Sequence, residues 1–188
     1  MHEKHVCIVG SGGLGGLYIL KMLARGRLLM FDLYNNTMDT FTAALCGTIA
    51  GLTRYTAKGV PGEALESVQF FEELGMEGDF HANGGDRQIS LLSLEEHRWM
   101  NVQTERGLCF ERYRENILTE GIPPAGFTPG VKLKIGEAIL EISNVNKRCF
   151  QECSLFSRGQ SCLLAGQHRF AKVIRSGFVQ IGDRVEIE

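Results

Sequence analysis

Short apolar segments separated by turn residues make up most of the chain from Gly47 to its end. Regular runs of this kind, with glycine and other turn residues between them, are typical of antiparallel sandwiches and barrels. The sequence therefore predicts a mainly β fold for this region. We expect strands at 47–55, 67–71, 87–92, 131–135, 138–143, 170–174 and 184–187.

Two of these strand regions repeat a local pattern. Residues 134–142 and 180–187 each place a glycine and an acidic residue between apolar segments. Glycine accepts backbone angles that other residues avoid, so it is favoured where a strand turns a tight corner. We expect Gly136 and Gly182 to supply such corners.

One helix is predicted after residue 92. Ser93 can act as its N-cap, and Glu96 stands at the position of a capping-box partner. Gly107 is placed to end the helix. His97 lies within it, where a structural role is the simplest interpretation.

The charge balance argues against nucleic acid as a partner. The chain has 188 residues, with 20 Lys and Arg against 22 Asp and Glu, a formal net charge of -2. Proteins that bind nucleic acid through a basic surface usually carry a positive excess. With 44% hydrophobic and 22% charged residues, the composition suits one folded domain, or one domain with an appendage.

The N-terminal apolar stretch 6–20 contains several glycines and is short for a membrane span. A secretory signal is the alternative interpretation, but Leu45 before Cys46 is too bulky for a cleavage site. We therefore expect no membrane association and a cytoplasmic protein. The cysteines are then expected to be thiols or ligands and not a disulfide framework.

The N-terminus carries a glycine-rich fingerprint. A strand at 5–9, a helix at 17–24 and a strand at 27–32 would form a β-α-β unit. Glycines at such a turn let the backbone approach a phosphate, and a later acid can accept from a ribose hydroxyl. The residues that fit this pattern are Gly10, Gly12, Gly15 and Asp32.

The pattern ends after Asn36, and one β-α-β unit cannot bury both faces of its sheet. We therefore divide the chain into a truncated dinucleotide-binding-like segment, 1–46, and a β domain, 47–188. Nucleotide binding through the glycine-rich loop remains an alternative function.

Polar residues gather between 75 and 88, just before a predicted strand. Loops carried on a rigid sheet often hold binding groups. His81 and Arg87 would suit an anion, because arginine presents a planar fork to phosphate or carboxylate. A polar turn with an internal Asp–Arg pair is the alternative. A second polar stretch, 112–122, offers Asn116 and Thr119, unless it is only a solvated edge strand.

A third stretch, 146–162, contains a cysteine directly after two cations. Lys147 and Arg148 precede Cys149, and neighbouring cations favour the reactive thiolate. A short helix beginning near Cys149 would strengthen this effect and place Cys153 on the same face. Zinc is disfavoured, since paired C-x-x-C motifs are missing from this stretch. Cys7, Cys46 and Cys109 are interpreted as small buried apolar residues.

Together the three stretches resemble the MOSC family, named after the C-terminal domain of molybdenum cofactor sulfurase. The resemblance spans about 47–188. It rests on G-D-F-H-A-N-G-G-D-R-Q at 78–88, R-E-N-I-L-T-E-G-I at 114–122, and I-G-E-A-I-L-E-I-S at 135–143 followed by a cysteine. The string I-V-G-S-G-G-L-G-G within 5–36 is similar to the start of ThiF-type adenylyltransferases, which also serve sulfur transfer.

The MOSC resemblance implies a β-barrel with a few short helices. It implies that Cys149 carries sulfur or ligates molybdenum in the molybdenum cofactor (molybdopterin), and that a cysteine desulfurase or a molybdoenzyme is the partner. It also implies a set of cofactor-binding residues, namely Asp79, His81, Arg87, Gln88, Asn116, Thr119 and Arg148.

Two departures from the family pattern stand out. Arg114 replaces the usual glycine before Glu115, where it closes the pocket or adds a phosphate contact. Cys153 and Cys162 are additional thiols that either resolve a persulfide on Cys149 or simply pack.

Some relatives reduce N-hydroxylated compounds with bound cofactor. A non-catalytic module that binds an anion or cofactor is the alternative to both activities.

Overall fold

A computed structural model of the chain describes residues 18–22, 27–32, 37–42, 46–122, 124–160, 162–165 and 167–188. The chain divides into two compact units, Met1–Cys46 and Gly47–Glu188. Within the described residues, no helix is long and apolar enough to span a membrane.

The described part of the first unit is a three-stranded antiparallel sheet in the order β1-β2-β3. Its strands are β1 (Tyr18–Met22), β2 (Arg27–Asp32) and β3 (Thr37–Thr42). The strand predicted at 5–9 and the glycine-rich loop lie outside the described residues.

The helix predicted at 17–24 is wrong, because Tyr18–Met22 is a strand that pairs antiparallel with β2. A short apolar run fits a helix or a strand equally well by periodicity. Here aromatic Tyr18 and β-branched Ile19 favour the strand. A second apolar run follows after four residues, so the two can pair with little loss of loop entropy.

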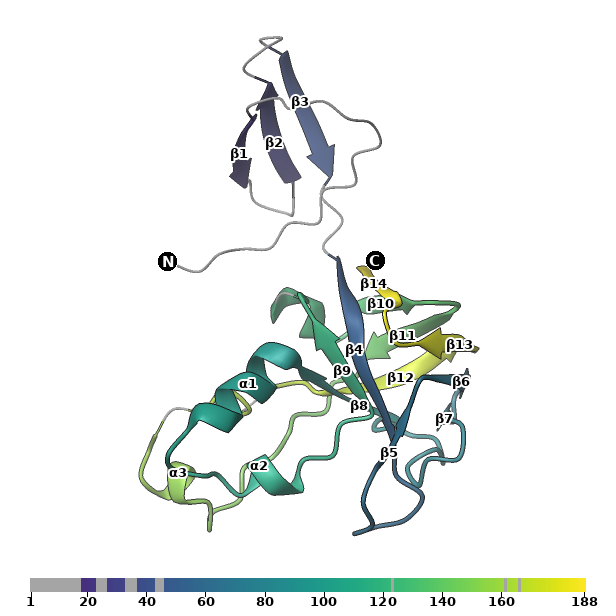
Figure 1. The fold of residues 1–188 in the computed structure, drawn as a ribbon, viewed down its shortest axis with the longest axis vertical. Coiled ribbons are helices and arrows are strands. Elements are labelled where there is room, and N and C mark those ends of the chain that lie inside the picture. Colours follow the sequence, from purple (N-terminus) through teal and green to yellow (C-terminus); the bar gives the residue numbers. More distant parts are fainter. Residues whose placement is uncertain are drawn as a thin grey trace. The chain divides into compact units, whose positions relative to one another are not determined.

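The second unit is built on a closed β-barrel, which confirms the predicted fold class (Figure 1). Its large sheet runs in the order β14-β10-β11-β12-β8-β9-β4-β5, and β14 also pairs with β4. Seven of these described strands thus form a ring, with β5 outside it. The strands are β4 (Cys46–Arg54), β5 (Glu63–Leu65), β8 (Ile89–Ser93), β9 (Ile117–Glu120), β10 (Lys132–Ile135), β11 (Ala138–Ile142), β12 (Phe170–Arg175) and β14 (Arg184–Ile187).

A smaller antiparallel sheet, β13-β6-β7, adjoins the barrel. It consists of β6 (Ser67–Phe71), β7 (Gly75–Met76) and β13 (Gly177–Gln180). The predicted corners at Gly136 and Gly182 are confirmed, since their φ angles are 54° and 85°. A side chain at Gly136 would also collide with the carbonyl oxygen of Phe178.

The core follows from strand periodicity. Alternate residues of β10 and β11 point inward, so Leu133, Ile135, Ala138 and Leu140 are fully buried. Strand β8 is buried along its whole length, as expected for a strand covered on both faces. It pairs in parallel with β9 and antiparallel with β12.

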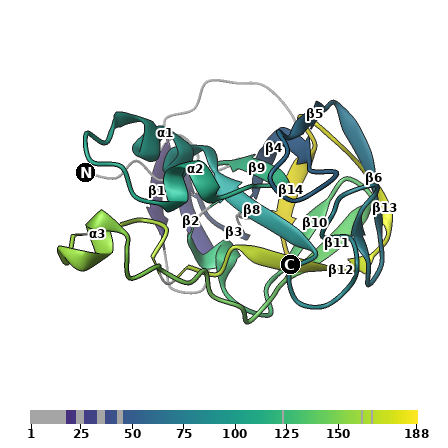
Figure 2. The ribbon, with the colours of Figure 1, turned by 90° about the horizontal axis from the view of Figure 1, so that it is seen from below.

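Helices α1 (Leu94–Val102), α2 (Cys109–Arg112) and α3 (Ser154–Ser157) gather on one side of the barrel, and β6 and β13 lie on the opposite side (Figures 1 and 2). A 3-10 turn spans Pro124–Phe127. The capping box of Ser93 and Glu96 is confirmed. The helix ends at Val102, earlier than Gly107, which instead packs closely against Leu155.

The capping residue Glu96 has a second role. It forms a buried ion pair with Arg169, whose guanidinium also lies 4.6 Å from the centre of the Phe127 ring. A buried charge needs its partner, because the low-dielectric interior does not solvate it. This pair therefore ties α1 to the segment that leads into β12.

We predict that Arg169→Met lowers the free energy of unfolding by about 3–5 kcal/mol, because it leaves Glu96 buried without a counter-charge. The matched control is Arg98→Met, which breaks the exposed pair with Glu120 and should cost less than about 1 kcal/mol. Urea denaturation of both variants measures the difference. Equal losses would contradict this role of the buried pair.

Candidate functional site

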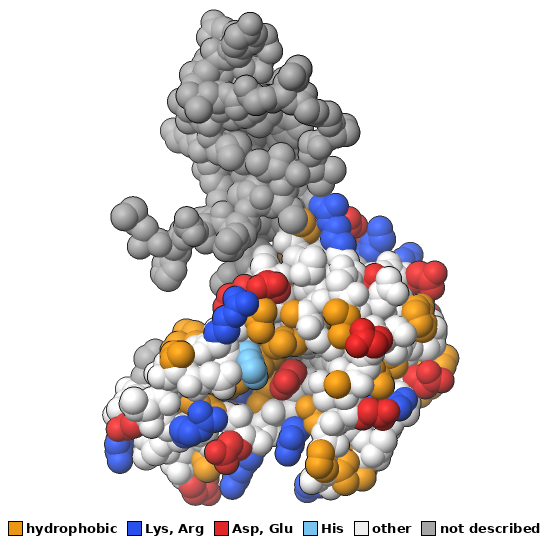
Figure 3. Space-filling model, in the orientation of Figure 1, with side chains coloured by type: hydrophobic (Ala, Val, Ile, Leu, Met, Phe, Trp, Pro, Cys, Tyr) orange, Lys and Arg blue, Asp and Glu red, His pale blue; other side chains and the backbone are white. Residues whose placement is uncertain are grey.

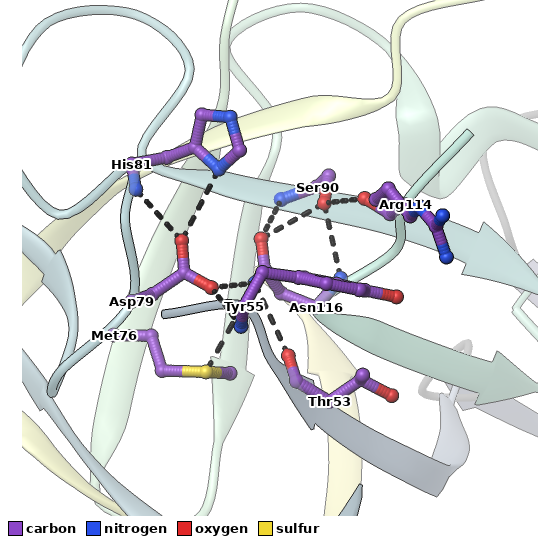
Figure 4. A network of polar contacts seen from close by, with 8 residues as sticks. All are labelled: Thr53, Tyr55, Met76, Asp79, His81, Ser90, Arg114 and Asn116. Carbon is purple, nitrogen blue, oxygen red and sulfur yellow. Dashed lines mark hydrogen bonds and ion pairs between the residues drawn. The ribbon is translucent and has the colours of Figure 1, made fainter. Parts of the chain in front are cut away.

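A buried carboxylate organises the loop that follows β7. The side chain of Asp79 is fully buried. Its Oδ2 accepts hydrogen bonds from the backbone N–H of Tyr55 and from Nδ2 of Asn116, both at 2.8 Å. Its Oδ1 accepts from the backbone N–H of His81 at 2.8 Å and lies 3.2 Å from the His81 ring Nδ1 (Figure 4).

Asn116 continues this network into the barrel. Its Nδ2 also donates to the carbonyl oxygen of Thr53 at 3.2 Å, and its Oδ1 accepts from the backbone N–H of Ser90 at 3.0 Å. The asparagine therefore joins β4, β8 and the start of β9 at one point (Figure 4). Buried polar groups are stable only when hydrogen-bonded, and these two side chains satisfy one another.

The structure therefore brings Asp79, His81 and Asn116 together, and their role in binding a cofactor stays a prediction. Asp79 and Asn116 use their polar atoms on each other and on the backbone, so in this conformation they position the loop. His81 is half exposed. Because its Nδ1 faces the carboxylate, its Nε2 is the ring nitrogen left for a ligand.

Gln88 and Thr119 lie away from this network and are buried. Gln88 accepts from the backbone N–H of Val173 at 2.9 Å and donates to the carbonyl oxygen of Gly85 at 3.0 Å. The hydroxyl of Thr119 donates to the carbonyl oxygen of Leu92 at 3.4 Å. The contact of Gln88 and Thr119 with a ligand stays a prediction. In the structure, the hydrogen bonds of Gln88 join the loop after β7 to β12, and that of Thr119 joins β9 to β8.

Arg87 and Arg114, in the segments that carry His81 and Asn116, are exposed. The guanidinium of Arg87 lies 5.0 Å from the centre of the Phe170 ring, and that of Arg114 lies 5.7 Å from the centre of the Tyr55 ring. Arg148 is exposed. Figure 3 shows a notch between the helices and the loop after β4, with Lys or Arg side chains at its edges. Such cations can meet an anionic ligand without prior desolvation.

Two titratable groups beside Arg114 have shifted pKa values. Burial raises the pKa of Glu115, and the attraction of His97 and Arg114 opposes this rise. Burial also raises the pKa of Tyr55, and the negative charge of Glu115 raises it further. His97, for which the sequence suggests a structural role, therefore lies near Glu115.

A second feature is a small cavity lined by four cysteines. Its volume is about 40 Å³. The segment around α2 and the segment 147–165 form its walls, and Phe150 and Phe156 stand at its rim. The cysteines are Cys109, Cys149, Cys153 and Cys162. Cys149 is half-buried, whereas Cys109 and Cys153 are buried.

The interpretation of Cys109 as a buried packing residue is confirmed, because Cys109 belongs to a core cluster with Leu92, Met100 and Leu164. Its sulfur has one further contact. Nζ of Lys147 donates to the sulfur of Cys109 at 2.6 Å, and both residues are buried. A buried ammonium requires a strong acceptor, and here the acceptor is a sulfur. The lysine predicted to act on Cys149 thus bonds directly to a different cysteine.

No helix begins at Cys149, so the additional effect that a helix there would have had on its thiol is not present. The chain around Cys149 has no regular structure, and α3 begins at Ser154 with Cys153 as its N-cap. Hydrogen bonds from backbone N–H groups, that of Phe156 foremost, lower the pKa of Cys153. Burial raises the pKa of Cys162, although the positive charge of Lys147 opposes this rise. The backbone N–H groups at the start of a helix therefore act on Cys153 and not on Cys149.

The cysteines are not arranged as a metal cage. Within the described residues, no group of three or more His, Cys, Asp or Glu side chains is placed to hold a metal ion. A metal at Cys149 would need its other ligands from a cofactor.

One segment links the two features. Cys109 lies in the cavity wall, the guanidinium of Arg112 lies 5.9 Å from the ring centre of Phe150, and Asn116 belongs to the Asp79 network. Between them, the hydroxyl of Tyr113 donates to the carbonyl oxygen of Leu91 at 2.9 Å. Cys109, next to Lys147, and Asn116, in the network beside His81, are thus seven positions apart in the chain.

Comparison with known proteins identifies this arrangement. The sequence model of the MOSC domain matches residues 77–186, more than half of the chain. The chain belongs to the MOSC domain family. The matched residues of this MOSC domain include the Asp79 loop, Asn116 and the whole thiol segment.

Solved structures share the fold. The YUAD protein from Bacillus subtilis matches with a TM-score of 0.57 and 20% identity, over 77% of this chain and 96% of that one. YiiM from Geobacillus stearothermophilus matches with a TM-score of 0.52 and 12% identity, over 76% and 75%. YiiM from Escherichia coli matches with a TM-score of 0.50 and 20% identity, over 75% and 69%. No curated protein sequence matches the chain.

We predict that Asp79→Asn lowers the free energy of unfolding of the MOSC domain by roughly 2–4 kcal/mol. The substitution replaces one acceptor oxygen of the Asp79 carboxylate by an NH2 donor. This donor would face N–H groups that now donate to the carboxylate. The matched control is Asp86→Asn, at an exposed aspartate paired with Lys172, which should change stability by less than about 1 kcal/mol. Denaturant titration with a barrel probe such as far-UV circular dichroism gives both values.

We predict that Glu115→Gln stabilises the domain at neutral pH and not at acidic pH. Because burial raises the pKa of Glu115, ionisation costs more in the folded state. The unfolding free energy therefore falls as pH rises past the ordinary glutamate value of about 4.3. Urea midpoints from about pH 4 to about pH 8 should separate variant from wild type only at the upper end. The exposed Glu66→Gln should show no such divergence.

Proposed function

We propose that this MOSC domain handles the molybdenum cofactor or its sulfur through Cys149. The observation that carries this proposal is the half-buried position of Cys149 in the wall of a cavity that three more cysteines and the buried Lys147 also line. A structural cysteine would be expected in a purely apolar interior. This one is half-buried, beside cations, and open to a reactant on one side.

The basic surroundings suit the negative charges of a phosphate-bearing cofactor. His81 presents Nε2, and Arg87, Arg114 and Arg148 are exposed. Arginine forks bind phosphate through paired hydrogen bonds. We propose that Arg114, where the family usually has glycine, adds a phosphate contact, since its aromatic contact with Tyr55 holds it beside the Asp79 network.

The thiolate of Cys149 and the exposed arginines suit the chemistry of molybdopterin, which has a soft metal centre and a phosphate group. A single cysteine thiolate is a soft ligand, and the cofactor's own groups would complete the coordination. When bound, the cofactor supplies a redox-active metal centre. The cavity of about 40 Å³ cannot enclose a pterin, so only atoms next to Cys149 would enter it. Cys149 would hold the reacting atom, and the exposed cations would hold the phosphate.

A sulfur-carrier role favours a protein partner, such as a cysteine desulfurase or a molybdoenzyme. Phe150 and Phe156, at the rim of the cavity, are 46% and 54% exposed. Exposed aromatic side chains are enriched where proteins dock. A partner could therefore bring its own reactive sulfur to Cys149 across this rim.

The test uses the full chain purified from cells grown with molybdate. Native mass spectrometry and elemental analysis should find either about one molybdenum and one pterin per chain, or a persulfide on Cys149. Cys149→Ser should reduce the corresponding signal at least tenfold, on the order of a lost ligand contact. Cys162→Ser, in the same cavity, is the matched control and should retain it.

The outcomes separate the alternatives. Pterin without dependence on Cys149 would support a non-catalytic binding module. Persulfide without pterin would support a sulfur carrier, and it would remove the activity toward N-hydroxylated compounds. Neither pterin, molybdenum nor persulfide in the wild type would overturn the proposal.

A further inference from the structure

A second pocket adjoins the thiol cavity and has no part in the function proposed so far. Its volume is about 260 Å³. One wall is the end of α1 with the residues after it, and the other is α3 with the residues after it (Figure 1). The residues that line it are Trp99, Gln103, Thr104, Glu105, Leu155 and Gln160.

The size and the place of this pocket suit a small ligand. Pockets for drug-sized molecules usually measure about 300–1,000 Å³, so a space of about 260 Å³ fits a smaller molecule. Leu155 and Gln160 line both this pocket and the thiol cavity. A bound molecule would therefore lie one layer of side chains away from the cysteines.

The end of α1 makes one wall of the pocket electronegative. The carbonyl groups in the last turn of a helix have no intrahelical partner and carry the negative end of the helix dipole. The last turn of α1 contains no basic residue that would offset this charge. Gln103 donates from Nε2 to the carbonyl oxygen of Trp99 at 3.0 Å, so its amide oxygen is a further acceptor in this wall.

Glu105 and Trp99 add two groups that attract a positive charge. Oε1 of Glu105 accepts a hydrogen bond from Nη1 of Arg158 at 2.8 Å, but the Glu105 side chain is 44% exposed. Exposed ion pairs are weak, so a ligand can compete for this carboxylate. The Trp99 ring packs edge-on against the Phe110 ring, with 5.4 Å between their centres. The indole is thus held in the wall, and indole is the aromatic group that attracts cations most strongly.

The lining disfavours an anion. Of the described residues that line the pocket, none is Lys, Arg or His. We propose that this pocket binds a small organic ammonium ion, with its charge beside Glu105 and the end of α1 and its apolar body against Trp99 and Leu155. The inference goes beyond the proposed function, which places an anionic cofactor at other residues, and it does not depend on that function.

The test uses the fluorescence of Trp99, which is the only tryptophan in the chain. The full chain is titrated with benzylamine, which is cationic at neutral pH, and with benzyl alcohol, a neutral molecule of nearly the same shape. Benzylamine should give a saturable change in emission with a Kd of roughly 1 mM. Benzyl alcohol should bind at least about tenfold more weakly. Benzoate, an anion of similar size, should bind no better than the alcohol.

Three substitutions test the charge, and thermal unfolding shows that each variant is folded. Glu105→Gln should weaken benzylamine binding about threefold to fivefold, because it removes the carboxylate charge and keeps the shape. The matched control is Glu111→Gln, at an exposed glutamate that pairs with Arg106 and does not line the pocket. It should leave the Kd unchanged. Arg158→Gln should tighten binding, because it removes the cation that competes for Glu105.

Several results would overturn the inference. Equal affinities for benzylamine and benzyl alcohol would show that charge does not select the ligand. An affinity for benzylamine that Glu105→Gln leaves unchanged, or that Glu111→Gln lowers equally, would contradict the role of Glu105. Weaker binding by Arg158→Gln would contradict the competition, and a Trp99 emission that does not saturate would remove the site. None of these results bears on Cys149, so the proposed function would stand.

Discussion

The site depends on one buried carboxylate. Asp79 accepts hydrogen bonds from the backbone beyond β4, from the loop after β7 and from Asn116 at the start of β9. An unpaired carboxylate at this depth would be costly, so the three segments stay together only in this register. The loop that carries His81 and Arg87 is therefore held by a polar interaction, while the barrel beneath it is held by apolar burial.

The thiol cavity is organised by a second buried charge. Lys147 draws Cys109 and the segment 147–165 together, and α3 binds the sulfur of Cys153. The four cysteines consequently have different environments within one cavity.

Much of the barrel could be predicted from the sequence, because its strands alternate buried and exposed residues and glycines mark their corners. The short strands β5, β7 and β13 were missed, since segments of two to four residues carry little periodic signal. The helix at 17–24 failed because a short apolar run fits both structures. In the site, the G-D-x-H and E-N motifs pointed to Asp79, His81 and Asn116. Nothing local to Cys109 distinguished it from a packing cysteine.

The sequence by itself determined the fold class, the capped helix α1, and which stretches carry polar and thiol chemistry, because these follow from periodicity and residue type. Tertiary structure decided which groups meet. Only the closed barrel brings Asn116 to Asp79, 37 residues away, and Lys147 to Cys109, 38 residues away. Buried polar groups select their partners by position and not by sequence distance. The assignment of Lys147 to Cys109, and of the helix N-terminus to Cys153, therefore emerged only in three dimensions.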